Sequence, residues 1–521
     1  MASAVDVSLA NRISGHLGMG GNLLDQALVC QVAGPVTRTQ IWGSLGTTCH
    51  GTLWAMLNRR QATCLGLGAL ALGGLGLIYL GWRGRSPNLP QDPYFQVFFN
   101  QRQTSRYRDP YRRIQRPGDN LEQVIIDAIA QATTSVDIAV QELNLPLVAQ
   151  ALIHRAKAGV TVRIILENQY NQVWHDLDHQ WIRQQDDYSR RKYENQLAFG
   201  DIDQDGHISA DEASQRDAIL MLRQAGIPIV DDTDDGTKGS GLMHHKFIVV
   251  DEAHIVTGSA NFTLSGLHGD WLIPESRGNA NALLTIHSPA LATAYTEEFD
   301  LMWGDGPDGE PDSRFGSPKP ARPPRAFSLP GSQVTVQFSP HRADTPREHT
   351  TNGIIADTLS RAQQSADLAL FVFTDQGIAD TLVTNTGLTV RTLIDQSFIY
   401  RSHSEALDML GLALSDHRCQ YEQDNHLWSP SIATVGYPEL ADGDKLHHKF
   451  ALLDDRTVII GSHNWSKAAN HTNDENLLII ENATVAQHFK QEFERLYGKA
   501  NLGRTDYLAR QVRKAVERCG G

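Results

Sequence analysis

The chain has 521 residues, more than one hydrophobic core usually organises, so at least two domains are expected. With 41% hydrophobic and 20% charged residues, the composition is that of a globular protein and excludes a largely disordered chain. The formal net charge of −14 disfavours a protein that coats nucleic acid, although a local basic cleft is compatible with it. The five cysteines are scattered, and they predict neither a disulfide framework nor a C-x-x-C metal site.

An apolar stretch lies near the amino terminus. Residues 64–82 contain no charge and are flanked by arginines, and the stretch is long enough for a helix that crosses a bilayer. We expect an uncleaved single-pass transmembrane anchor here, with a cleaved signal peptide and a buried core helix as alternatives. Residues 1–63 are then an N-terminal extension. Residues 83–118 hold a first strand and eight arginines, and predict a basic juxtamembrane segment suited to an anionic lipid surface.

The rest of the chain contains two copies of one pattern. Each copy begins with a strand, continues with an amphipathic helix and an apolar strand, and closes with a helix. The stretch GVTVRIILE from Gly159 in the first copy matches GLTVRTLID from Gly387 in the second. This alternation predicts two similar α/β lobes, each with a largely buried sheet. We place lobe 1 at 119–303, a linker at 304–332, lobe 2 at 333–500 and a C-terminal tail at 501–521.

The first copy carries an insertion at about 174–215. It contains DIDQDGHISADE, residues 201–212, whose residue types follow the calcium loop of a single EF-hand. The predicted ligands of Ca²⁺ are Asp201, Asp203, Asp205, His207 and Glu212. An acidic surface loop between two helices is the alternative. An EF-hand without a paired neighbour would need about millimolar calcium, which favours an extracytoplasmic position for the lobes.

A short motif occurs once in each copy. HHKFIVVDEAHIVTGSANF begins at His244, and HHKFALLDDRTVIIGSHNW begins at His447. Side chains two positions apart on a strand share a face, so His244 points with Lys246 and His447 with Lys449. The histidines can act as nucleophile and acid, while the lysines supply positive charge for an anionic phosphodiester.

Two further features accompany each motif. Asp251 and Asp454 end the motif strand before a turn, where a catalytic role and a structural Asx-turn role are both open. The G-S-x-N segment that follows offers hydroxyl and amide groups to phosphate oxygens. The predicted phosphate-binding residues are Ser259, Asn261, Ser462 and Asn464.

Two copies of H-x-K-x4-D, each with G-S-x-N in register, resemble the signature of the phospholipase D superfamily over about residues 95–500. The resemblance implies two α/β sandwiches packed face to face, with both motifs in one shared active site of a monomer. It also implies metal-independent chemistry, in which one histidine forms a covalent phosphohistidine. The other histidine protonates the leaving alcohol and later activates water. We assign His244 as the nucleophile and His447 as the general acid, with the reverse order as the alternative.

The two copies differ after the motif. NDENLLII in the second copy places Glu475 where this family often has an acid that orients a catalytic histidine. The first copy reads GNANALLTI, and we match Ala280 to that position. We therefore expect Glu475 to orient one histidine only, with a solvated strand-edge acid as the alternative.

The family implied by the resemblance contains phospholipases, phosphatidyl transferases and nucleases. The anchor and the basic segment favour a phospholipase D that hydrolyses glycerophospholipids at a membrane to phosphatidic acid and the free head group. An endonuclease acting on DNA or RNA is the second hypothesis, and a phosphatidyl transferase is the third. An inactive phosphate-binding scaffold is disfavoured by the intact motifs. A zinc site built from His244, His245, His447 and His448 is disfavoured because two lysines would lie beside the metal.

Overall fold

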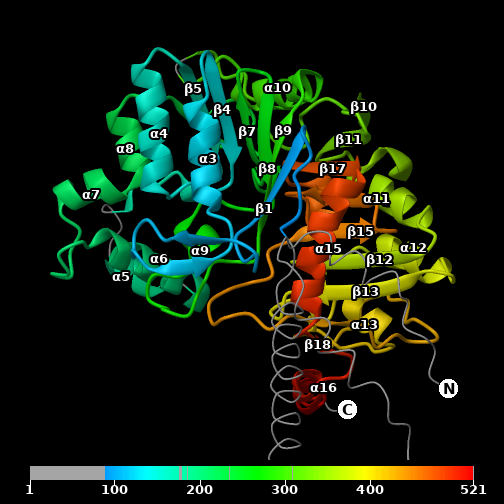
Figure 1. Ribbon diagram of the computed structural model, residues 1–521. Helices are drawn as coiled ribbons and strands as arrows, with labels where there is room; N and C mark the ends of the chain where they lie inside the picture. The colour runs from blue at the N-terminus through cyan, green and yellow to red at the C-terminus, as the bar shows by residue number, and fades with distance from the viewer. Residues whose placement is uncertain (1–87, 175–178, 185, 234, 308, 520–521) are drawn as a thin grey trace, which may run out of the picture. The chain divides into compact units, whose positions relative to one another are not determined.

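The repeated sequence pattern forms two β-sheets in a computed structural model of the protein, which describes residues 88–519 apart from 175–178, 185, 234 and 308. Each sheet carries helices on both faces and builds one lobe (Figure 1). Within the described range, the first copy of the pattern forms a sheet of seven strands and the second a sheet of nine. The prediction of an α/β fold with two similar lobes is therefore confirmed.

The sheet of lobe 1 mixes parallel and antiparallel strands. Its order is β1 (Phe95–Phe99), β9 (Ala282–His287), β8 (His254–Gly258), β7 (Lys246–Val250), β4 (Ser135–Val140), β5 (Thr161–Leu166) and β6 (Ile229–Asp231). One face packs against α3 (Leu121–Ala130), α4 (Pro146–Lys157) and α8 (Ala218–Gln224), and the other against α10 (Pro289–Trp303). Because β7 runs antiparallel to β4, it begins at the edge where β4, β5 and β6 end. The first histidine motif lies at this edge.

The sheet of lobe 2 repeats this arrangement. Its order is β10 (Arg325–Leu329), β11 (Ser332–Ser339), β17 (Glu475–Glu481), β16 (Thr457–Gly461), β15 (Lys449–Leu453), β12 (Ser365–Leu370), β13 (Thr389–Ile394), β14 (Val435–Tyr437) and β18 (Asn501–Leu502). One face packs against α11 (Thr351–Ser360), α12 (Gln376–Thr384), α13 (Glu405–Met409) and α16 (Asp506–Cys519), and the other against α15 (Ala483–Tyr497). The antiparallel β15 again begins where β12 and β13 end, so the second motif has the same place in its lobe.

The two lobes share one apolar core. Tyr295 and Phe299 of α10 belong to the same buried cluster as Phe489 and Phe493 of α15, together with side chains from the inner face of each sheet. Figure 1 shows α15 in the middle of the molecule, where it contacts β1 of lobe 1 as well as β12, β15 and β16 of lobe 2. Burying each large apolar side chain contributes about 1.5–3 kcal/mol, so this core holds the lobes in a fixed relation.

The remaining elements lie outside the two sheets. They are the hairpin β2 (Arg106–Arg108) and β3 (Gln115–Pro117), the short helices η2 (Asn168–Tyr170), α9 (Leu264–Leu267), η4 (Arg347–His349) and α14 (Lys467–His471), and the helices of the predicted insertion, α5 (His179–Gln184), α6 (Asp187–Gly200) and α7 (Ala210–Arg216). In Figure 1 the insertion helices gather below α4 and α8, at the side of lobe 1.

The basic segment predicted at 83–118 is built into lobe 1 over most of its described part. Three of its arginines form internal ion pairs, Arg102 with Asp119, and Arg112 and Arg116 with Asp109. Three others stay exposed on the hairpin, namely Arg106, Arg108 and Arg113. Among the arginines of this segment that the structure describes, the three exposed ones are available to a lipid surface.

Lobe 2 extends beyond the boundaries predicted for it. β10 begins at Arg325, inside the predicted linker, and β18 and α16 lie inside the predicted tail. The linker itself is tied to both lobes, because Lys319 lies 2.5 Å from Glu298 of α10 and 2.5 Å from Asp474.

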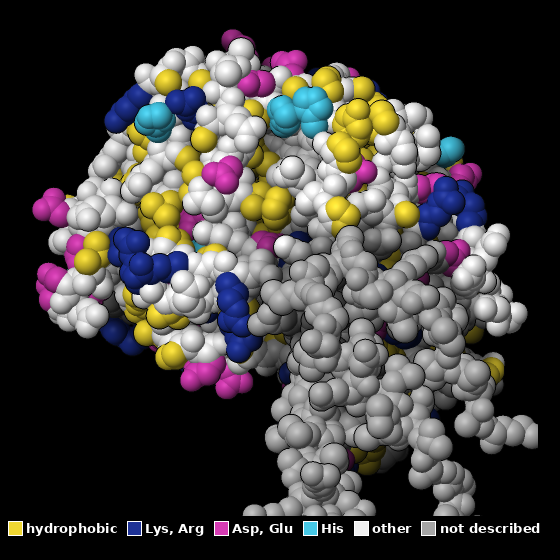
Figure 2. Space-filling view, viewed as in Figure 1, with side chains coloured by type: hydrophobic (Ala, Val, Ile, Leu, Met, Phe, Trp, Pro, Cys, Tyr) yellow, Lys and Arg dark blue, Asp and Glu magenta, His cyan; other side chains and the backbone are white. Residues whose placement is uncertain are grey.

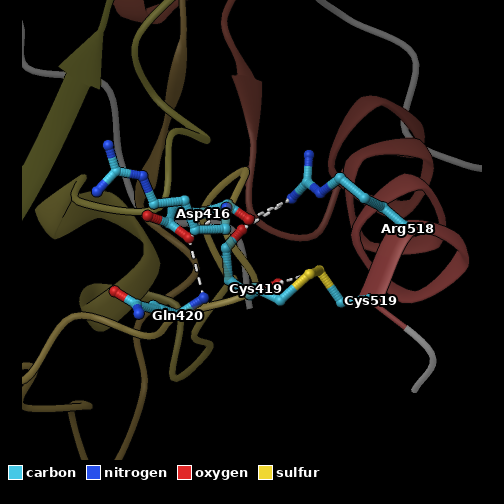
Figure 3. The surroundings of a disulfide bond; sticks show 7 residues. Asp416, Cys419, Gln420, Arg518 and Cys519 are labelled. Atoms are coloured by element: carbon cyan, nitrogen blue, oxygen red, sulfur yellow. Dashed lines mark hydrogen bonds between the residues drawn. A yellow bond between two sulfur atoms is a disulfide. The ribbon is translucent and has the colours of Figure 1, made fainter.

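A disulfide joins α16 to the body of lobe 2, although the sequence predicted no disulfide framework. Cys419 and Cys519 are bonded across 100 residues of chain (Figure 3). Beside the bond, the Arg518 guanidinium donates to the carbonyl oxygens of Ser415 and Asp416 at 3.1 and 2.8 Å. The helix therefore belongs to the folded lobe.

Among the residues that the structure describes, no helix combines the length and the apolar character needed to cross a bilayer. The anchor predicted at 64–82 lies outside these residues, and so does the extension at 1–63.

Removing the disulfide should destabilise the protein. Closing a loop of 100 residues restricts the unfolded chain, which in the chain-entropy account stabilises the fold by about 4.7 kcal/mol. We expect Cys519→Ser to lower the urea midpoint of unfolding. Cys419→Ser and reduction of the wild-type protein should have the same effect, and the double variant should lose no more than either single one. An unchanged midpoint in all of these would show that the bond is absent in solution.

Candidate active site

The two histidine motifs meet where the lobes touch. Ahead of β7, the backbone N–H of His244 donates to the carbonyl oxygen of Asp474 in lobe 2 at 3.0 Å. Ahead of β15, the backbone N–H of His447 donates to the carbonyl oxygen of Ala280 in lobe 1 at 3.1 Å. Each motif is thus attached at its start to the opposite lobe, which brings both histidines and both lysines into one site.

Each histidine side chain is also oriented by the opposite lobe. Nδ1 of His244 lies 2.7 Å from a carboxylate oxygen of Glu475, and Nδ1 of His447 lies 3.0 Å from the amide oxygen of Asn281. With Nδ1 donating to oxygen in both cases, the lone pair of each neutral ring is on Nε2. Glu475 was predicted to orient one histidine, and the histidine that its carboxylate contacts is His244.

The position matched to Glu475 in the first copy was wrong by one residue. Gly258 pairs with Leu283 in lobe 1 and Gly461 pairs with Leu477 in lobe 2, so Asn281 is the counterpart of Glu475. Ala280 corresponds to Asp474 instead. A one-residue slip on a strand turns the side chain to the opposite face, and the slip hid Asn281 as the partner of His447.

The motif lysines are completely buried beside the histidines. Nζ of Lys246 donates to the backbone carbonyl of His244 at 2.8 Å and to the side-chain oxygen of Gln141 at 3.4 Å. Nζ of Lys449 donates to the backbone carbonyl of His447 at 2.9 Å. Gln141 was not anticipated from the sequence, and its amide oxygen also accepts a bond from Asn261 at 3.2 Å.

Burial controls the protonation of the site. It holds the pKa of both His244 and His447 well below the ordinary value, and the charges of the two lysines lower these pKa values further. Burial also lowers the pKa of Lys246 to about 7 and holds that of Lys449 well below its usual range. The pKa of Glu475 is raised by the same burial. An anionic phosphate that enters the site would raise the pKa values of the two histidines and the two lysines again, because it favours their protonated forms.

The serines and asparagines of the two G-S-x-N segments differ in burial. The Ser259 hydroxyl donates to the side-chain oxygen of Asn281 at 2.8 Å. The Ser462 hydroxyl accepts the backbone N–H of Asn476 at 3.0 Å and lowers the pKa of Glu475 against the larger effect of burial. Both serines are fully buried. Asn261 and Asn464 are only half-buried, in contrast to the two serines.

The motif aspartates lie away from the histidines. Asp251 accepts backbone N–H groups of Thr133, Thr134 and Ser135, and Asp454 accepts those of Gln363, Gln364 and Ser365, at 2.7–3.0 Å. Each aspartate follows its histidine by seven positions, and five of the residues between them form the motif strand, so the separation is about 23 Å of extended chain. Of the two roles left open for Asp251 and Asp454, the geometry supports the structural one and does not support direct participation in catalysis.

The second histidine of each motif points away from the site. Nε2 of His245 lies 3.2 Å from Glu298 of α10, and Nε2 of His448 lies 3.0 Å from Glu492 of α15. The four motif histidines therefore do not converge as a zinc site would require. Within the described residues, the one cluster of side chains close enough together to hold a metal ion consists of three aspartates in another part of lobe 1.

That group lies in the inserted loop. Asp201, Asp203 and Asp205 each offer an oxygen within 4.8 Å of the others. Of the other predicted ligands, Glu212 accepts the backbone N–H groups of Ile202 and Ser209, and the His207 side chain is exposed. Three hard carboxylate oxygens suit Ca²⁺ better than a softer metal, so part of the predicted donor set fits the ion.

The insertion also reaches the rim of the active site, which the sequence did not reveal. Lys192 of α6 lies 2.8 Å from Glu142, the second residue after β4, and its ammonium lies 3.6 Å from the ring centre of Tyr170. The charge of Glu142 raises the pKa of Lys246 against the larger effect of burial. Helix α6 thus contacts Glu142, whose charge influences the pKa of Lys246.

Comparison with known proteins agrees with this geometry. The family model described as "Cardiolipin synthase, PLD-like domain" matches residues 125–303 and 355–497, together more than half of the chain. The chain therefore belongs to the phospholipase D family and is a phosphodiesterase with two phospholipase D-like (PLD-like) domains.

Several curated relatives are similar to parts of the chain. Mitochondrial cardiolipin hydrolase of Xenopus tropicalis is 28% identical over 203 residues, which cover 38% of this chain and 86% of that protein. Phospholipase D of Rickettsia typhi is 25% identical over 178 residues, which cover 32% of this chain and 76% of that protein. Among solved structures, phosphatidylserine synthase of Haemophilus influenzae is 12% identical with a TM-score of 0.48, over 81% of this chain and 90% of that one.

Binding of a phosphate-like anion should weaken as pH rises. The pKa of Lys246 is about 7 in the free site, and an anion favours the protonated lysine, so binding takes up a proton above pH 7. We expect the dissociation constant of tungstate to increase by up to about tenfold per pH unit between pH 7 and 9 for each proton taken up. Titration calorimetry in buffers of different ionisation enthalpy measures this uptake.

Lys246→Met should reduce the proton uptake by about one, whereas Lys499→Met, at an exposed position, should leave it unchanged. An affinity independent of pH in the wild-type protein would show that both lysines keep their charge in the free site.

Proposed function

We propose that the protein is a phospholipase D that hydrolyses glycerophospholipids to phosphatidic acid and the free head group through a phosphohistidine on His244. The observation that carries the assignment is the 2.7 Å contact between Glu475 and Nδ1 of His244. A carboxylate on Nδ1 makes Nε2 more nucleophilic and stabilises the positive charge that the ring acquires when it is phosphorylated. The neutral amide of Asn281 gives His447 no such stabilisation, which suits an acid that must release its proton.

The reaction proceeds in two steps. Nε2 of His244 attacks phosphorus, the bond to the leaving alcohol breaks, and protonated His447 delivers its proton to the departing oxygen. A water molecule then gives a proton to His447 and attacks phosphorus, and the bond to His244 breaks. The Lys246 and Lys449 ammonium groups stabilise the non-bridging oxygens in both transition states. An alcohol that replaces water in the second step gives phosphatidyl transfer instead.

Three observations favour a lipid over nucleic acid. The relatives in the comparison are named as cardiolipin hydrolases and a phospholipase D. The hairpin β2–β3 exposes three arginines beside Ile114, which is 44% exposed, as a surface that contacts anionic lipid would. On the face seen in Figure 2, basic and acidic side chains are interspersed over lobe 1, unlike the continuous basic track along which a nucleic-acid backbone binds.

The substrate can be tested with the full chain in detergent. We expect head-group release from glycerophospholipid vesicles, faster when the vesicles contain anionic lipid, and formation of phosphatidylethanol when ethanol is present. His244→Ala and His447→Ala should each lower turnover by at least about a thousandfold, since nucleophile and acid act as a unit. Rapid cleavage of single- or double-stranded DNA or RNA with lipid untouched would favour the endonuclease instead.

The proposal extends to the inserted loop and to location. Asp201, Asp203 and Asp205 would hold one Ca²⁺ that stabilises the insertion and takes no part in the chemistry. A membrane anchor at 64–82 would keep the enzyme at its substrate, with the lobes on the extracytoplasmic side. The Cys419–Cys519 bond supports that side, because disulfides persist in oxidising compartments.

Calcium should raise the melting temperature of the protein. A ligand that binds only the folded state stabilises it by about 2.7 kcal/mol at a hundredfold excess over its dissociation constant. Asp203→Ala should remove the calcium-dependent shift, and Asp211→Ala, an exposed acid of the following helix, should retain it. Activity on lipid should persist in EDTA. A melting temperature insensitive to calcium in the wild-type protein would refute the calcium site.

A further inference from the structure

The two sides of the shared site differ in chemistry. Gln141 follows β4 and Phe371 follows β12 at equivalent positions, because Val140 pairs with Lys246 as Leu370 pairs with Lys449. Lys246 therefore has an amide beside it, whereas the Lys449 ammonium lies 5.0 Å from the centre of the Phe371 ring. The lobe 1 side is polar and the lobe 2 side is aromatic.

Phe371 and Phe398 form an aromatic shelf beside His447. The ring centre of Phe371 lies 4.9 Å from that of His447 and 4.7 Å from that of Phe398. Both phenylalanines are only half-buried, so the shelf is open on one side. Because the shelf lies beside His447, the proposed general acid, its position indicates which part of the substrate it contacts. In an in-line displacement the leaving group departs on the side of the general acid, so the shelf contacts the leaving alcohol.

The protein's own cations already cover this shelf. The Arg401 guanidinium lies 4.0 Å from the ring centre of Phe398, and the Lys445 ammonium lies 5.9 Å from that of Phe371. Burial lowers the pKa of Lys445, and the charges of Asp395 and Asp270 oppose this by favouring the ammonium form. Asp395 is held there by the backbone N–H groups of Leu446 and Ser397.

This arrangement opposes a cationic head group. An open aromatic face attracts a quaternary ammonium group, but here the rings are engaged by protein cations, and a further positive charge would be repelled. A negatively charged group would instead find Arg401 and Lys445 within reach beside a low-dielectric ring surface.

Resting on the proposed function, we propose that Phe371 and Phe398, with Arg401 and Lys445, form the leaving-group subsite and select a leaving alcohol that carries a phosphate over one that carries a quaternary ammonium. The substrate class that fits is a phospholipid whose head group bears a second phosphate. The subsite binds the part of the substrate that is released, while the diacyl part remains on His244.

The proposal is tested with soluble short-chain lipids, which remove the effect of vesicle surface charge. Dihexanoyl phosphatidylcholine, phosphatidylglycerol and phosphatidylglycerol phosphate are compared as substrates of the full chain by kcat/KM. Bis(p-nitrophenyl) phosphate serves as a reference diester that lacks all of these head groups. The measured quantity is the ratio between substrates within one variant, so a general loss of activity cancels.

We expect the wild-type protein to prefer the phosphate-bearing head group over choline. Arg401→Met with Lys445→Met should lower that ratio by about tenfold or more, as loss of charged contacts to one substrate does. Lys490→Met is the matched control, because this exposed lysine of α15 pairs with Asp455, which follows the end of β15 remote from His447. Its ratio should equal that of the wild type.

Contrary outcomes are distinguishable. A wild-type preference for choline, or equal ratios in the wild-type and double-variant proteins, would overturn the subsite while leaving the phospholipase proposal in place. Absence of turnover on every diester, the nitrophenyl reference included, would overturn the proposed function and the subsite with it. An oligonucleotide cleaved faster than all three lipids would do the same.

Discussion

Neither lobe contains a complete active site, because each motif histidine takes its orienting hydrogen bond from the opposite lobe. Glu475 holds His244 and Asn281 holds His447. Hydrogen bonds weaken steeply when their geometry changes, so these contacts require two sheets that are fixed relative to one another. The common apolar core around α10 and α15 supplies that rigidity, and Lys319 of the connecting segment adds ion pairs to both lobes.

The same packing that aligns the site also removes water from it. Two lysines and two histidines lie close together in this dry environment. Burial lowers all four pKa values and so favours the neutral form of each side chain. A phosphodiester that enters brings the missing negative charge, so binding energy is concentrated on the reacting group. In the proposed mechanism, His447 thereby becomes a competent acid only when substrate is present.

The sequence predicted the parts of this molecule that are local and repeated. Paired motifs, strand periodicity and helix patterns located both lobes, the histidines, the lysines and Glu475. What it missed depends on register or on distant contacts. Aligning Leu283–Leu284 with Leu477–Leu478 makes Asn281 the counterpart of Glu475. The residues before these leucine pairs differ between the two copies, so they do not fix the alignment by themselves. The pairing of Cys419 with Cys519, and that of Lys192 with Glu142, join segments whose proximity only the tertiary fold creates.

The carboxylate at Glu475 and the amide at Asn281 bear on how such an enzyme specialises. If the two lobes were separate identical chains related by a two-fold axis, every change near one histidine would appear at the other. Neither ring could then be improved as a nucleophile without being impaired as an acid. Joining the copies in one chain breaks that symmetry, so each half can change on its own. Under the proposed roles, the difference between the Glu475 carboxylate and the Asn281 amide is a division of labour that two identical chains could not keep.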